Sequence, residues 1–128
     1  DLMINTILIV DDSTISRKIV KKCLPKDREF NLFEAGDGLA GLEKFKEIKP
    51  DLVFLDLTMP VMDGVQALKE IIKVNKDAVV VVQTADVQRK TISNVMDAGA
   101  FTLLRKPLSP EAVAEVLRLI EGTGHKKG

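Results

Sequence analysis

Acidic, hydroxyl and basic side chains follow several apolar runs of this sequence at the points where the runs end. Asp11 and Asp12 come directly after one run, and Asp56 is the single charge within another. Thr84 and Lys106 follow two later runs. Two carboxylates about 4 Å apart repel by about 4 kcal/mol at an effective dielectric constant of 20. If the first two runs are neighbouring strands, a proton or a cation must therefore lie between these acids.

The types of ligand atom indicate which cation this is. A cluster of carboxylates without histidine or cysteine selects a hard ion, and Mg²⁺ usually combines one or two carboxylates with phosphate oxygens. A carboxylate held beside such an ion can attack a phosphorus centre and become an acyl phosphate. Asp56 is the candidate for that attack, with Asp11 and Asp12 at the metal. Lys106 would offer a compact positive charge to the transferred group, and Thr84 a hydroxyl hydrogen bond.

The apolar runs predict the strands that position these groups. Four runs are nearly continuous, which is typical of parallel strands buried on both faces. A fifth run, over residues 30–35, alternates only weakly and suits a strand near the edge of the sheet. The four continuous runs are 7–10, 52–57, 79–82 and 101–104.

Segments of helical period separate the runs, and their apolar stripes predict helices that cover the sheet. The last helix has Ser109 as its N-cap and Pro110 at its first position, and Gly99 is predicted to end the fourth helix. The stripes in chain order are Ile15, Ile19, Val20 and Cys23; Leu39, Leu42 and Phe45; Val65, Leu68, Ile71 and Ile72; Ile92, Val95 and Met96; and Val113, Val116, Leu117 and Ile120.

Alternating strands and helices predict a doubly wound α/β fold, a five-stranded parallel sheet in the order 2-1-3-4-5 with the flavodoxin-like (βα)5 arrangement. Ligands bind to such a sheet at the carboxyl ends of strands one and three, where the winding reverses. The three acids fall at this place. We expect one domain over residues 5–121, with an N-terminal extension at 1–4 and a flexible tail at 122–128.

Length and charge exclude several classes of function. The 128 residues suit one domain, and 19 basic against 19 acidic residues give no net charge, so the chain lacks the electrostatics of a nucleic-acid or anionic-membrane binder. No apolar run is long enough to span a bilayer, and the N-terminus has no signal-peptide pattern. The single cysteine, Cys23, cannot form an internal disulfide. We therefore expect a cytoplasmic protein.

Several short motifs make the sequence resemble the receiver domains of two-component response regulators. The resemblance covers roughly residues 5 to 121, and it is greatest for the single-domain chemotaxis type, since nothing follows the fifth predicted helix. The motifs are Val10-Asp11-Asp12-Ser13, Asp56-Leu57-Thr58-Met59-Pro60 with Met62-Asp63-Gly64, Thr84-Ala85, and Gly99-Ala100-Phe101 before Lys106-Pro107.

The resemblance implies that Asp56 is phosphorylated by a histidine kinase or a phosphotransfer protein in a Mg²⁺-dependent reaction. The metal ligands it implies are Asp12, Asp56 and the backbone carbonyl of Thr58, with Asp11 assisting through water. The domain would then be a phosphoacceptor that assists its own phosphorylation and dephosphorylation, and not an enzyme.

The resemblance also implies a switch. Thr84 and Lys106 would contact the phosphoryl group, with Ala85 and Pro107 as supporting residues and a cis peptide bond before Pro107. Thr84 would move toward the phosphate while Phe101 rotates inward. This movement would reshape the face made by helix four, strand five and helix five, to which a downstream effector protein or a second copy would bind.

Other interpretations of the same residues remain open. Asp12 could be the cap of the first helix, Asp63 the cap of the third, and Asp11 a solvated strand end. A Mg²⁺-dependent aspartyl phosphohydrolase of the haloacid dehalogenase type would carry Asp-x-Asp on strand one, where this chain has adjacent Asp11 and Asp12. A flavodoxin-like cofactor binder would need a hydroxyl-rich phosphate loop and stacking aromatic residues. A degenerate receiver would bind partners without phosphorylation.

Overall fold

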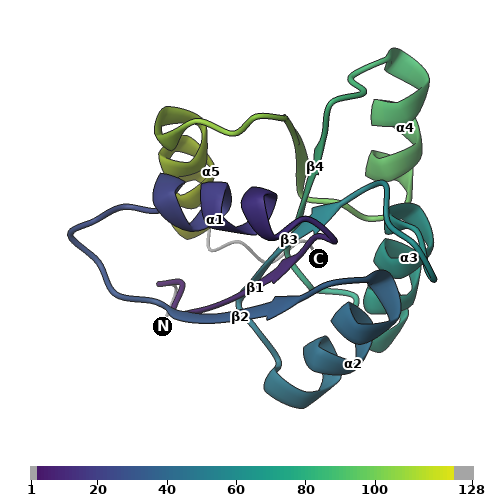
Figure 1. The fold of residues 1–128 in the computed structure, drawn as a ribbon, viewed down its shortest axis with the longest axis horizontal. Coiled ribbons are helices and arrows are strands. Elements are labelled where there is room, and N and C mark those ends of the chain that lie inside the picture. Colours follow the sequence, from purple (N-terminus) through teal and green to yellow (C-terminus); the bar gives the residue numbers. More distant parts are fainter. Residues whose placement is uncertain (1–2, 123–128) are drawn as a thin grey trace.

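Five strands alternate with five helices over residues 3–122, which are the residues that the computed structural model describes (Figure 1). Every predicted strand is present, with ends that lie within two residues of the predicted ones. The elements are β1 (Thr6–Val10), α1 (Thr14–Cys23), β2 (Asn31–Ala35), α2 (Gly38–Ile48), β3 (Leu52–Asp56), α3 (Gly64–Val74), β4 (Val80–Thr84), α4 (Arg89–Asp97), β5 (Thr102–Arg105) and α5 (Pro110–Gly122).

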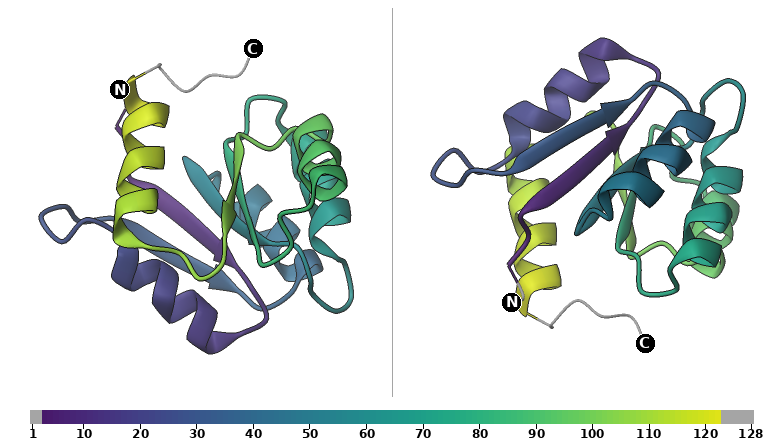
Figure 2. Two further views of the ribbon diagram at one scale, coloured as in Figure 1. Left: turned by 90° about the horizontal axis from the view of Figure 1, so that it is seen from above. Right: turned by 90° about the horizontal axis from the view of Figure 1, so that it is seen from below.

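The strands form one parallel sheet in the order β2-β1-β3-β4-β5, which confirms the predicted doubly wound fold. Helices α1 and α5 cover one face of the sheet, and α2, α3 and α4 cover the other (Figures 1 and 2). The winding reverses between β1 and β3, and Val10 pairs in register with Leu55. The residues that follow them, Asp11 and Asp56, therefore lie beside each other at the carboxyl edge of the sheet.

Alternate residues of the central strands belong to two separate cores. On β3, Val53 and Leu55 pack under α2, α3 and α4, whereas Leu52 and Phe54 pack under α1 and α5. All five residues of β3 are buried because helices cover both faces of the sheet. By the same alternation Asp56, two residues after Phe54, lies toward the α1 and α5 side. The fold thus carries a carboxylate at the end of a fully buried strand.

Polar side chains cap four of the helices. Each accepts a hydrogen bond from the backbone N–H three residues farther along the chain, which satisfies one of the unpaired donors at the helix start. The prediction for Ser109 is confirmed, and the N-cap of α1 is Ser13 and not Asp12. The four capping residues are Ser13, Asp37, Asp63 and Ser109.

Parts of the predicted helical stripes are wrong, because they are exposed. Ile15 is 71% exposed and Leu39 is 43% exposed. Both lie in the first turn of a helix, where the helix begins beyond the carboxyl edge and the sheet does not cover it. On α4, Ile92 and Met96 are also exposed, and Val95 is the single buried residue. This helix is therefore the most loosely held of the five.

The packing changes two of the predicted boundaries. Ile4, placed in an N-terminal extension by the sequence, is buried in the core under α1 and α5, and its N–H donates to Glu121 at 2.9 Å. Gly122, placed at the start of a tail, is the last residue of α5. Residues 123–128 of the predicted tail lie outside the described residues. Gly99 has φ +112° and follows Ala98, the C-cap of α4, as its predicted role at the helix end requires.

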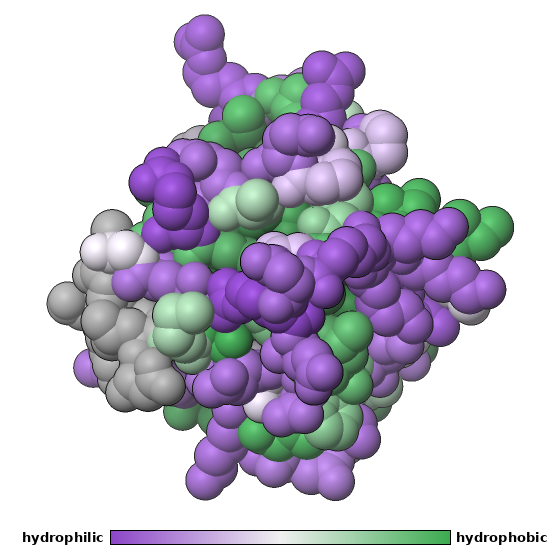
Figure 3. All heavy atoms as spheres, turned by 90° about the vertical axis from the view of Figure 1, so that its left-hand side faces the viewer, coloured by the Kyte–Doolittle hydropathy of each residue, from purple (hydrophilic) through white to green (hydrophobic). Residues whose placement is uncertain are grey.

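Polar and charged side chains cover most of the face seen in Figure 3, with smaller apolar areas between them. A polar surface of this kind is expected for a chain in which 30% of the residues are charged. Over residues 3–122, no helix combines the length and the apolar character needed to cross a bilayer.

Candidate functional site

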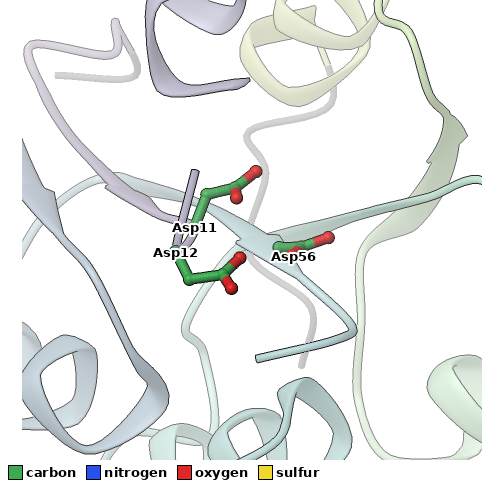
Figure 4. A group of neighbouring side chains, drawn as sticks. All are labelled: Asp11, Asp12 and Asp56. Atoms are coloured by element: carbon green, nitrogen blue, oxygen red, sulfur yellow. The ribbon is translucent and has the colours of Figure 1, made fainter. Parts of the chain in front are cut away.

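Three carboxylates meet at the carboxyl edge of the sheet. Asp11, Asp12 and Asp56 each offer an oxygen, and these oxygens all lie within 4.8 Å of one another (Figure 4). Asp11 is fully buried and Asp56 is 6% exposed, whereas Asp12 is exposed. The interpretation of Asp11 as a solvated strand end is therefore wrong, and the predicted juxtaposition of the three acids is present.

Lys106 joins two of these acids. Its Nζ lies 3.0 Å from Oδ2 of Asp11 and 3.0 Å from Oδ1 of Asp56. The other oxygen of Asp11 accepts a hydrogen bond from the N–H of Ser13 at 2.9 Å. Asp11 thus has both oxygens engaged and fixes the position of the ammonium, which leaves Asp12 and Asp56 as the carboxylates better placed to bind a cation directly.

The electrostatics of the cluster favour an added cation. Burial raises the pKa of Asp56 above its ordinary value, and repulsion from Asp11 and Asp12 adds to this, although the hydrogen bond from Lys106 opposes it. For Lys106, burial lowers the pKa, but the hydrogen bonds to Asp11 and Asp56 and the negative charges of these two carboxylates together raise it above its ordinary value. One ammonium therefore does not fully compensate the three acids. The all-oxygen donor set fits Mg²⁺, as the sequence predicts.

Thr84 ends β4 beside the cluster and is 6% exposed. Its hydroxyl oxygen accepts a hydrogen bond from the N–H of Asp86 at 3.1 Å, so the hydroxyl hydrogen can still be donated elsewhere. Its carbonyl accepts a hydrogen bond from the N–H of Lys106 at 2.9 Å, which ties the ends of β4 and β5 together. The peptide bond between Lys106 and Pro107 is cis, as the family resemblance implies.

The loop after β3 folds back, so that Gly64 at its far end lies against the end of β3. The N–H of Gly64 donates to the carbonyl of Leu57 at 2.8 Å, and a Cβ added to Gly64 would lie 2.3 Å from the carbonyl oxygen of Asp56. Only glycine permits this approach. Thr58 is exposed in this loop, and together with Asp63 it lines a cavity of about 360 Å³. The participation of its carbonyl in metal binding stays a prediction.

The remaining predicted site residues are Ala85, Pro107 and Phe101, and they differ in their position relative to Lys106. Ala85 and Pro107 border a cavity on the α1 and α5 side of the sheet, next to Lys106. Phe101 precedes β5 at the end away from Lys106, where it is half-buried and packs against the core under α1 and α5. The structure thus brings Ala85 and Pro107 near Lys106 but not Phe101, whose role as a switch stays a prediction.

Sequence reasoning missed the surroundings of the acids. Arg17 lies on α1, and its Nη1 donates a hydrogen bond to the carbonyl of Asp11 at 2.5 Å. Arg17 and Lys21 also form ion pairs with Glu34 on β2, at 2.8 and 2.9 Å. Gln83, which had no predicted role, is 1% exposed and pairs in register with Asp56. The buried run before Gln83 is the signal that could have indicated its burial.

The comparisons with known proteins agree with this geometry. Residues 7–118 match the model of the response regulator receiver domain. The chemotaxis protein CheY of Thermotoga maritima is 38% identical over 114 residues, which cover 89% of this chain and 95% of that protein. CheY of Bacillus subtilis is also 38% identical, with 90% of this chain and 96% of that protein covered.

A solved structure shows the same fold with a similar sequence. The crystal structure of a CheX–CheY–BeF3–Mg²⁺ complex from Borrelia burgdorferi matches with a TM-score of 0.85 and 30% identity, covering 92% of this chain and 90% of that chain. The strand order, the acid cluster and the family model therefore lead to the same conclusion. This chain belongs to the response regulator receiver domain family.

Proposed function

We propose that Asp56 accepts a phosphoryl group from a histidine kinase or a phosphotransfer protein, in a Mg²⁺-dependent reaction in the cytoplasm. The observation that carries the proposal is the position of Asp56, whose buried carboxylate lies 3.0 Å from Lys106 Nζ and within 4.8 Å of Asp11 and Asp12. A buried carboxylate beside two other carboxylates favours a further cation in addition to Lys106, and Asp56 lies at the end of a strand, two residues before the exposed Thr58.

The chemistry follows from the donor set. A carboxylate oxygen of Asp56 forms a bond to phosphorus while the bond from phosphorus to the donor nitrogen breaks, and the product is an acyl phosphate. Asp12, Asp56 and the carbonyl of Thr58 would hold Mg²⁺, which supplies positive charge against the phosphate oxygens when it is bound. Asp11 orients Lys106, and Lys106 then pairs with the transferred group.

The second part of the proposal is that phosphorylation changes the surface of α4, β5 and α5. Thr84 lies next to the cluster and can move its hydroxyl toward a phosphoryl oxygen, with Phe101 turning inward along β5. The loose packing of α4, which buries only Val95, supports a change at this face. We propose a downstream effector protein or a second copy as the partner. A complex of a CheY with another protein, as in the Borrelia structure, supports the first of these.

Intact mass spectrometry after incubation with acetyl phosphate and Mg²⁺ tests the proposal. We expect one added phosphoryl group on the parent chain, none on Asp56→Ala, and full labelling of the control Asp27→Ala, whose exposed side chain lies outside the cluster. Asp12→Ala should lose the Mg²⁺-dependent labelling. An unlabelled parent would indicate a degenerate receiver, and repeated hydrolysis of a phosphate ester would indicate a phosphohydrolase.

A further inference from the structure

Asp11 is held at each of its polar groups. Its N–H donates to the carbonyl of Ala35 at 3.0 Å, and both of its carboxylate oxygens accept hydrogen bonds. Its carbonyl accepts a hydrogen bond from Arg17 Nη1 at 2.5 Å. Because Asp11 is also fully buried, the peptide bond that leads from it to Asp12 starts from a fixed position.

The side chain of Asp12 depends on this peptide bond for its position. Asp12 is exposed, and its carboxylate extends toward Asp56 (Figure 4). Within residues 3–122, no hydrogen bond or ion pair holds this carboxylate. The carbonyl of Asp11 and the N–H of Asp12 belong to one planar unit. A group that holds the Asp11 carbonyl therefore fixes the plane from which the Asp12 side chain extends.

Arg17 is itself fixed by three acceptors. Besides the carbonyl of Asp11, its guanidinium donates to Glu34 Oε1 at 2.8 Å and to Thr14 Oγ1 at 3.3 Å, with a different nitrogen for each acceptor. Glu34 lies on β2, the strand that pairs with β1. The side chain of Arg17 is 17% exposed. A planar guanidinium suits this arrangement of acceptors, whereas a lysine ammonium is a single point charge.

We propose that Arg17 is a positioning residue for the metal site. Through the carbonyl of Asp11, it holds the peptide bond before Asp12 in the orientation that directs the Asp12 carboxylate to the cation. This inference rests on the proposed function, in which Asp12 and Asp56 bind Mg²⁺. Groups that orient metal ligands in this way typically change the metal affinity by about 10- to 100-fold when they are removed.

The charge of Arg17 separates positioning from simple electrostatics. A guanidinium repels a divalent cation, so the loss of its charge alone would leave Mg²⁺ binding unchanged or make it tighter. The loss of positioning makes Mg²⁺ binding weaker, because Asp12 must then be ordered when the cation binds. The two effects have opposite signs, and the direction of the change in affinity decides between them.

A titration of the full chain with Mg²⁺ alone, followed through the backbone amide of Ser13 in ¹H–¹⁵N NMR spectra, measures the affinity. Arg17→Gln should raise the Kd about tenfold, and Arg17→Lys, which keeps the charge but not the three hydrogen bonds, should raise it by a similar factor. The matched control is Lys21→Gln. It removes the other ion pair of Glu34, at 2.9 Å from the same helix, and leaves the hydrogen bonds of Asp11 in place. Its Kd should stay within about twofold of the parent value.

A second measurement requires no metal. The ¹⁵N relaxation of the metal-free protein reports backbone motion on the picosecond to nanosecond scale. In both Arg17 variants, we expect the order parameter of the Asp12 amide to fall from about 0.85 toward about 0.6, and in Lys21→Gln we expect no change. If Arg17 only tied α1 to β2, its substitution would lower the melting temperature without a change in the Kd or in this order parameter.

Two results would overturn the inference and leave the proposed function intact. One is Mg²⁺ binding to Arg17→Gln and Arg17→Lys that is as tight as in the parent, or tighter. The other is an unchanged order parameter at Asp12 in both variants. A parent chain that does not bind Mg²⁺ would overturn the proposed function as well, so the two failures are distinguishable. If Arg17→Gln does not fold, Arg17→Lys decides the question, since it keeps an ammonium beside Glu34.

Discussion

Replacing Asp56 by asparagine should stabilise the protein in the absence of divalent metal. The Asp56 oxygen lies within 4.8 Å of an oxygen of Asp11 and of one of Asp12, and each repulsion is worth about 3.5 kcal/mol at an effective dielectric constant of 20. The attraction between Asp56 and Lys106 Nζ, at 3.0 Å, offsets about 5.5 kcal/mol of this repulsion. Repulsion therefore exceeds attraction by about 1.5 kcal/mol, and the burial of the charge adds to this.

We expect Asp56→Asn to raise the free energy of unfolding by about 2 kcal/mol at pH 7, or the melting temperature by roughly 6–10 °C, since Lys106 keeps its ion pair with Asp11. The pKa of Asp56 is raised in the folded state, so its carboxylate destabilises the fold above that pKa. The advantage of asparagine should accordingly shrink as the pH falls through that pKa.

Thermal unfolding with and without Mg²⁺ measures both effects. Mg²⁺ at about 100 times its dissociation constant should stabilise the parent by about 2.7 kcal/mol, and it should stabilise Asp56→Asn far less. The control Asp27→Asn should change stability by no more than about 0.5 kcal/mol. The reasoning is refuted if Asp56→Asn is less stable than the parent without metal, or if Mg²⁺ stabilises both equally.

Two further predictions concern Gly64 in the loop after β3 and the ion pair between Arg28 and Glu121. Gly64→Ala should lower the free energy of unfolding, measured by urea denaturation, by more than about 3 kcal/mol, because its Cβ would lie 2.3 Å from the carbonyl oxygen of Asp56. The control Gly36→Ala should lower it by less than about 1 kcal/mol, because the atom nearest to its Cβ would be 3.9 Å away. Arg28→Ala should cost about 1–3 kcal/mol because it removes two hydrogen bonds to the half-buried Glu121, whereas Arg118→Ala, in an exposed pair, should leave the melting temperature unchanged. Equal effects of the two substitutions in either pair would contradict the packing described here.

The sequence predicts the fold well because local and long-range signals agree. The apolar runs predict all five strands, and caps such as Ser109 predict where a helix begins. The meeting of the three acids was predictable since the winding rule places the ends of strands one and three together. The ion pair between Asp11 and Lys106 was not predictable, because Lys106 follows β5 and lies 95 positions farther along the chain than Asp11.

The burial of individual side chains was the least predictable property. Ile15 fits a helical stripe, yet the helix begins beyond the sheet and leaves this side chain exposed. Gln83 is a polar residue near the end of a strand, which suggests exposure, yet it is 1% exposed. In both cases the neighbours that decide burial are distant in sequence, and no periodicity reports them. The roles of Thr58 and Phe101 remain predictions.

The single buried residue of α4 has a consequence for how the domain moves. Helices α3 and α5 each bury four residues, and their amide protons should exchange with solvent mainly when the whole domain opens. Helix α4 has only Val95 as an anchor, so its amides should exchange through local opening at a much lower free energy. We therefore expect α4 to open locally while the sheet and its carboxylates keep their places.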